Sequence, residues 1–102
     1  MIYHHKLVRD KIPELIHLNG KTCKTRNLNQ DEFSFELKRK LEEEVKEFLD
    51  NPSGEELADI IEVVESLASM EGISLNDVLR IKEEKKEKRG GFSDQIFLEY
   101  VN

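Results

Sequence analysis

Residues 40–59, KLEEEVKEFLDNPSGEELAD, contain the turn that decides the fold. The DNPSG stretch interrupts a helical pattern, since proline cannot continue a helix and Ser53 is a good first residue for the next one. Apolar residues recur at helical spacing on both sides: Phe33, Leu37, Leu41, Val45 and Phe48 before the turn, and Leu57, Ile60, Ile61, Val64, Leu67 and Ala68 after it. We therefore predict helices over residues 31–50 and 53–71. A connection this short makes them an antiparallel hairpin.

The segments outside the hairpin carry weaker helix signals. RDKIPELIHLNG (residues 9–20) predicts a short helix that Asp10 caps and Asn19-Gly20 ends. Ser74 predicts the start of another long helix, which runs to about Arg89 and closes at Gly90-Gly91. The tail FSDQIFLEYV (92–101) alternates weakly, which favours an extended strip lying on the helices. Together these patterns predict a single all-α domain over residues 1–102.

Composition and charge narrow the class of protein. The chain has 102 residues and a net charge of −6, with 37% apolar and 37% charged residues. An acidic chain lacks the basic face that nucleic acids and anionic membranes require, so we expect neither as a partner. No apolar run approaches the roughly 20 residues of a membrane span. A lone Cys23 and the lack of a signal peptide lead us to expect a cytoplasmic protein.

Carboxylates crowd around the turn. Between residues 42 and 59 there are eight, against one lysine: Glu42, Glu43, Glu44, Glu47, Asp50, Glu55, Glu56 and Asp59. Glu44 and Glu47 are three residues apart and share one helical face, and Glu56 and Asp59 repeat that spacing on the partner helix. The hairpin can bring both pairs to one level. Four hard oxygen donors in one place suit Mg²⁺ or Mn²⁺.

An ordinary solvated acidic face is the competing interpretation. Glu56 follows Ser53 by three residues, which is the spacing of a capping box, so the second pair has a structural reason to be acidic. The first pair has none, because Glu47 lies near a helix C-terminus, where the helix dipole disfavours anions. From spacing alone, both interpretations stay open.

Basic residues gather at two other places. Lys82, Lys86 and Arg89 form a stripe at positions i, i+4 and i+7 that suits phosphate contact, although cations also belong at a helix C-terminus for structural reasons. Near the chain start, Arg9 and Lys11 are best interpreted as forming internal ion pairs with Asp10 or with the acidic helices.

Three blocks and the paired carboxylates resemble a known superfamily. ExxE (Glu44, Glu47) followed by ExxD (Glu56, Asp59) in a helical hairpin resembles the signature of the all-α nucleoside triphosphate pyrophosphatases, which include MazG-like proteins and dimeric dUTPases. The blocks KLVRDKIPELI (6–16), ELADIIEV (56–63) and RGGF (89–92) are similar to a small house-cleaning branch of that superfamily. The resemblance extends over nearly the whole chain. Only eight residues separate Glu47 from Glu56, fewer than in many members.

The resemblance implies a MazG-like helical bundle, dimeric or higher, and an activity. A nucleoside triphosphate would be hydrolysed to a monophosphate and pyrophosphate with Mg²⁺, or Mn²⁺, held by Glu44, Glu47, Glu56 and Asp59. Glu44 and Glu47 would be the catalytic pair, one of them also orienting the attacking water. Glu43 is an alternative first ligand because the EEE run leaves the register open. Lys86 and Arg89 would contact the substrate phosphates.

Other functions fit the same sequence. Within enzymes, a phosphoribosyl-ATP pyrophosphohydrolase is the main alternative to an enzyme that clears non-canonical nucleotides. A non-catalytic helical module, whose acidic hairpin docks a basic partner, would show no dependence on metal. No motif identifies the base or the sugar of a nucleotide substrate.

Overall fold

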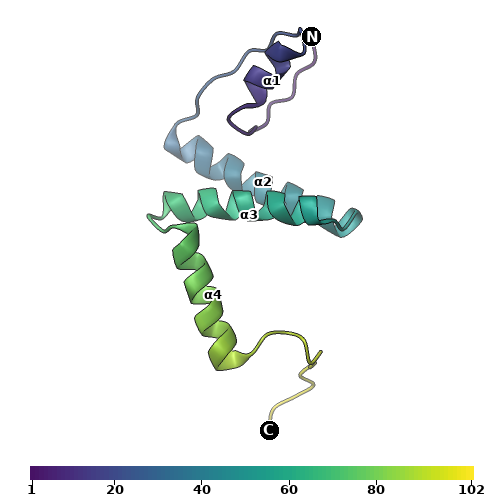
Figure 1. Ribbon diagram of the computed structural model, residues 1–102, viewed down its shortest axis with the longest axis vertical. Coiled ribbons are helices and arrows are strands. Elements are labelled where there is room, and N and C mark those ends of the chain that lie inside the picture. The colour runs from purple at the N-terminus through teal and green to yellow at the C-terminus, as the bar shows by residue number, and fades with distance from the viewer.

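An antiparallel helical hairpin forms the centre of the molecule. The computed structural model describes residues 1–102 and contains four helices and no strand: α1 (Ile12–Leu18), α2 (Gln30–Asp50), α3 (Gly54–Met70) and α4 (Leu75–Arg89). Helices α2 and α3 lie side by side across the middle of the molecule, joined by residues 51–53 (Figure 1). The all-α fold and the predicted hairpin are confirmed, with each boundary within one residue.

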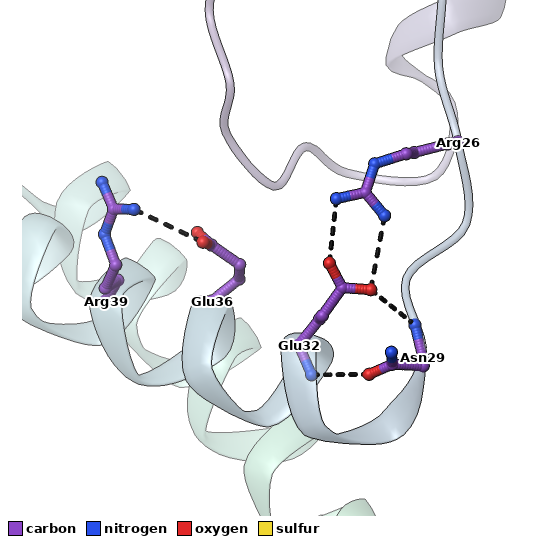
Figure 2. A network of polar contacts seen from close by, with 5 residues as sticks. All are labelled: Arg26, Asn29, Glu32, Glu36 and Arg39. Atoms are coloured by element: carbon purple, nitrogen blue, oxygen red, sulfur yellow. Dashed lines mark hydrogen bonds and ion pairs between the residues drawn. The ribbon is translucent and has the colours of Figure 1, made fainter.

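Side chains before the hairpin fix where α2 begins. Asn29 Oδ1 accepts a hydrogen bond from the Glu32 backbone N–H at 2.9 Å, and the Glu32 carboxylate accepts one from the Asn29 N–H at 3.4 Å. Arg26 holds the same carboxylate from the other side, at 2.9 and 3.3 Å (Figure 2). This capping box satisfies N–H groups that the first turn of a helix leaves without partners.

Helices α3 and α4 follow the predicted stop and start signals. The Ser53 hydroxyl accepts from the Glu56 N–H at 3.2 Å, and Ser74 and Asp77 form a full capping box. Between the two helices, Gly72 adopts a positive φ of 74°, and the Ile73 N–H bonds back to the Ala68 carbonyl at 2.9 Å. This bond closes α3 in the Schellman pattern that glycine permits.

The predicted helix near the chain start forms, but its predicted cap does not. Lys11 occupies the N-cap position of α1 with helical backbone angles and no capping hydrogen bond from a side chain. The Ile12 N–H bonds to the Arg9 carbonyl at 3.1 Å, so Asp10 lies within a turn rather than at the helix end. Pro13 lacks an N–H, which leaves one donor fewer for a cap to satisfy.

The interior of this chain is small. Only Leu37, Val63 and Ala68 are buried apolar residues, and all three lie on the two hairpin helices. The Cα radius of gyration is 18.1 Å, whereas a compact chain of about 100 residues has a value of about 13 Å. No helix is long and apolar enough to cross a membrane.

The C-terminal part extends away from the hairpin. Helix α4 leaves the end of α3 opposite the turn and carries the tail outward (Figure 1). Phe92 is 97% exposed, and every residue from Arg80 to the end is exposed. The prediction of a tail strip lying on the helices is therefore wrong for this chain. The direction of α4 explains it, because that helix starts the tail far from the hairpin surface.

Candidate metal centre

Carboxylates from both hairpin helices converge at one point. Glu44 from α2 and Glu56 and Asp59 from α3 each offer a carboxylate oxygen, and these oxygens lie within 4.8 Å of one another. A second group, Glu43, Glu44 and Glu47, meets the same criterion on α2 alone. Glu44 belongs to both groups and thus lies at the centre of the cluster. We call Glu44, Glu47, Glu56 and Asp59 the carboxylate cluster.

Glu44 is the unusual member of the cluster. It is 6% exposed, the only charged residue among the four buried residues of the chain, and its Oε2 atom has no hydrogen-bond partner. Burial raises the pKa of Glu44; the Glu47 carboxylate raises it further, and Lys40 opposes the shift. A buried carboxylate oxygen without a partner costs free energy unless a proton or a cation satisfies it.

Glu56 shows the same signs on the partner helix. Its backbone N–H is bonded to Ser53, but its side chain does not complete the capping box that Asn29 and Ser74 make with their helices. Instead its Oε2 is buried and unpartnered. Desolvation raises the pKa of Glu56, and the Glu47 and Glu44 carboxylates add to the rise. Of the capping box predicted at Ser53 and Glu56, only the hydrogen bond from the Glu56 N–H to the Ser53 hydroxyl therefore forms.

Glu43 and Glu47 are exposed at the edge of the cluster. The position of Glu44 on the face of α2 toward α3 distinguishes it from Glu43, which joins only the group on α2. The sequence left the choice between these two open, and the geometry favours Glu44 as the residue shared with α3.

Two cations flank the cluster within this chain. The Arg9 guanidinium lies 2.6 Å from Asp59 Oδ1, fifty residues away in sequence, which confirms the predicted ion pair between Arg9 and the acidic helices. The same prediction is wrong for Lys11, whose exposed side chain forms no ion pair. Lys40 Nζ lies 3.5 Å from Glu44 and 3.7 Å from Glu43. The Lys40 contact was missed, although its spacing of four residues from Glu44 is a signal that the sequence contains.

Lys86 and Arg89 are not brought to the cluster. Both are exposed on α4, which leaves the hairpin at the end opposite the turn (Figure 1). The neighbouring Lys82 pairs with Glu83, its adjacent residue, at 3.1 Å. Phosphate contact by Lys86 and Arg89 stays a prediction that would need a second copy of the chain.

The donor set fits a hard divalent cation. Carboxylate oxygens are the ligands that Mg²⁺ and Mn²⁺ prefer, and the two unpartnered oxygens of Glu44 and Glu56 are the atoms that such an ion would satisfy. An ordinary acidic surface keeps its carboxylates in water and far enough apart to stay ionised. In this cluster Glu44 is buried, and its carboxylate lies within 4.8 Å of those of Glu56 and Asp59.

Comparison with known proteins adds one partial relative. An uncharacterized protein from Mycolicibacterium smegmatis is 52% identical over 42 residues, which cover 41% of this chain and 43% of that protein. The match thus spans less than half of either sequence. No family model and no solved structure matches the chain.

Proposed function

We propose that this chain is a Mg²⁺-dependent nucleoside triphosphate pyrophosphohydrolase of the MazG-like type, cytoplasmic and able to use Mn²⁺ as well. The observation that carries the proposal is the buried Glu44, which has one oxygen without a hydrogen-bond partner and whose carboxylate lies among those of Glu47, Glu56 and Asp59. The similarity of the ExxE and ExxD motifs to those of the all-α nucleoside triphosphate pyrophosphatases supports the same proposal. Four carboxylates in a tight hairpin suit a reaction in which a highly charged phosphate chain must be neutralised.

Each carboxylate has a role in this proposal. Glu44, Glu47, Glu56 and Asp59 would hold the metal, which when bound neutralises phosphate oxygens and lowers the pKa of water. Glu47 is exposed at the edge of the cluster, where it can orient the attacking water and accept its proton. The water oxygen forms a new bond to phosphorus, the bond to the pyrophosphate oxygen breaks, and a nucleoside monophosphate is released with pyrophosphate.

The identity of the nucleotide is part of the test. Clearance of non-canonical triphosphates follows from the resemblance, and phosphoribosyl-ATP is the alternative substrate. The decisive assay measures pyrophosphate release from a panel of canonical and modified triphosphates and phosphoribosyl-ATP, with Mg²⁺, with Mn²⁺ and with a chelator. Wild type is compared with Glu47→Gln and with Glu42→Gln, an exposed carboxylate of the same helix outside both metal groups.

Metal-dependent release that Glu47→Gln abolishes and Glu42→Gln retains is the expected result. Release that continues in the chelator, or is equal in the two variants, would contradict the proposed role of the cluster. No release from any member of the panel would favour a non-catalytic module that docks a basic partner.

We also propose that the working protein is a homodimer or a larger homo-oligomer. Three buried apolar residues are too few to stabilise a domain of this length, since a chain of about 100 residues normally buries more than 60% of its unfolded surface. Val45 and Leu49 on α2, and Leu57 and Ile61 on α3, form two exposed apolar pairs at the turn end of the hairpin. We call these four residues the hairpin patch and expect a second copy to cover it.

Light scattering on the purified chain tests the assembly. We expect a mass of at least two chains for wild type and a shift toward one chain for Leu49→Lys or Ile61→Lys, because a charge in a buried apolar contact is costly. Leu18→Lys, at an exposed apolar position on α1, is the control. A wild-type monomer with full activity would contradict the oligomer.

A further inference from the structure

A groove adjoins the carboxylate cluster on the side of the N-terminal segment. It has a volume of about 420 Å³ and lies between residues 7–11 and the hairpin. Glu44 and Asp59 form part of its wall, so a cation bound by the cluster would also face the groove. Apolar side chains from both helices, Leu37 and Val63 among them, line another part.

Three cations line this groove, and they differ in how they are paired. Lys40 contacts Glu43 and Glu44, and Arg9 contacts Asp59. Lys11 lines the groove without any ion pair. Arg9 makes a single side-chain hydrogen bond, although a guanidinium has five N–H donors, so most of its donors stay available for a ligand.

The charge balance makes anion binding conditional on metal. Four acidic side chains line the same groove: Asp10, Glu44, Asp59 and Glu62. Without a metal they outnumber the three cations, so the groove does not attract a free anion. A divalent cation on Glu44 and Asp59 adds two positive charges and reverses the balance. Lys11 and the N–H groups of Arg9 that do not contact Asp59 then remain on the N-terminal segment to bind the anion.

We propose that Arg9 and Lys11 form the phosphate-binding side of this groove and hold the pyrophosphate portion of the nucleotide against the metal cluster. This inference rests on the proposed function and assigns phosphate recognition to the N-terminal segment rather than to Lys86 and Arg89. Arg9 suits the task because its planar fork can bind a phosphate while one N–H stays on Asp59. Lys11 supplies a point charge that no carboxylate of this chain neutralises.

Calorimetry with inorganic pyrophosphate tests the inference on the full chain. Mn²⁺ alone is titrated first, and pyrophosphate is then titrated with Mn²⁺ present and with a chelator present. Lys11→Gln is the main variant because the Lys11 side chain makes no ion pair or hydrogen bond that the substitution would break, and Lys6→Gln, an exposed lysine outside the groove, is its control. Arg9→Gln and the double variant Lys86→Gln/Arg89→Gln complete the set.

We expect all four variants to bind Mn²⁺ within about threefold of wild type. Pyrophosphate in the presence of Mn²⁺ should bind at least tenfold more weakly to Lys11→Gln and Arg9→Gln, a loss of about 1.4 kcal/mol or more. Lys6→Gln and the α4 double variant should bind pyrophosphate as wild type does.

Two results would separate failure of this inference from failure of the proposed function. Wild-type pyrophosphate affinity in Lys11→Gln and Arg9→Gln, with normal Mn²⁺ binding, would overturn the groove assignment and leave the metal site intact. Absence of Mn²⁺ binding in wild type would remove the proposed function. The groove assignment would fall with it, because without a metal the groove does not attract pyrophosphate.

Discussion

The turn end of the hairpin and helix α4 are both rich in charge, but they arrange it differently. Every ion pair of α4 joins residues at most four apart, such as Arg80 with Glu84 at 3.1 Å. At the turn end, Arg9 meets Asp59 across fifty residues, and carboxylates from two helices meet each other. No residue of α4 is buried, whereas Glu44 is.

This difference separates a solvated charged helix from a candidate site. Exposed pairs along one helix contribute about 0.3–0.5 kcal/mol each and leave every carboxylate with water. Convergence across elements removes water from like charges, which raises the pKa of both Glu44 and Glu56. A count of charged residues does not distinguish the two regions. Only the turn end of the hairpin has a buried, unpartnered carboxylate that a cation would stabilise.

The largest expected contrast concerns packing. Leu37 is 4% exposed between α2 and α3, whereas Ile81 on α4 is 42% exposed. Leu37→Ala should cost about 2–5 kcal/mol of unfolding free energy because it leaves a cavity at the helix contact. Ile81→Ala should cost about 0.5 kcal/mol, as surface substitutions do. Urea unfolding of both variants measures the contrast, and equal losses would show that α4 is packed against something outside this chain.

Metal binding should give the next largest contrast. Mn²⁺ at a hundred times its Kd would add about 2.7 kcal/mol of stability, or roughly 10–20 °C in Tm for a chain of this size. Glu44→Gln should lose this shift while staying at least as stable as wild type without metal, since it removes a buried charge that lacks a full partner. Glu84→Gln on α4 should keep the shift.

Thermal unfolding of the three proteins with Mn²⁺ and with a chelator is the measurement. A retained shift in Glu44→Gln would contradict the central place of Glu44 in the cluster. Equal loss in Glu84→Gln would point instead to diffuse attraction of the metal by negative charge.

The hairpin was predictable because its signals are local. Pro52, the Ser53 cap and the apolar spacing on each side act within a few residues, and the structure follows them. The ExxE and ExxD spacing likewise identified four carboxylates that share a level of the hairpin, since an antiparallel turn fixes which positions face each other. Convergence of Glu44, Glu56 and Asp59 followed from that register.

Other features were not predicted correctly or stay untested, most of them because they depend on where distant elements lie. The tail's alternation is compatible with packing on a helix, but the direction of α4 takes it elsewhere (Figure 1). Aspartate is a favoured N-cap residue, but the turn before α1 places Lys11 rather than Asp10 at the N-cap position. The stripe of Lys86 and Arg89 looked suited to phosphate, whereas the cations that reach the cluster come from Arg9 and Lys40.

A smaller effect should appear in the pH dependence of the metal-free protein. The pKa of Glu44 and that of Glu56 are both raised above 4.5, so the folded state binds protons more tightly than the unfolded chain. Stability should therefore rise as pH falls from 7 toward 5. Three other carboxyls have lowered pKa values: Glu32, Asp77 and Glu83. Their contribution to the stability of the protein is lost only at about pH 4.5 and below.

Tm measured from pH 7 to 5 in the presence of a chelator tests whether stability rises as the pH falls. With saturating Mg²⁺ the trend should reverse, because protons then compete with the metal for the same carboxylates. Glu44→Gln should flatten the metal-free rise, and Glu84→Gln should leave it unchanged. A wild-type Tm that falls steadily from pH 7 in chelator would mean that the cluster is stably ionised without metal.

The smallest contrast lies in the helix caps. Ser53→Ala and Ser74→Ala each remove a hydroxyl that accepts a backbone N–H, worth about 1 kcal/mol. At Ser53 the loss falls on α3, whose packing on α2 forms the core, so amide exchange should quicken throughout the hairpin. At Ser74 it falls on a helix with no buried residue, so exchange should quicken in α4 alone while hairpin protection stays near wild type. Global loosening in Ser74→Ala would show that α4 supports the hairpin, and the two regions would then have to be treated as one cooperative unit.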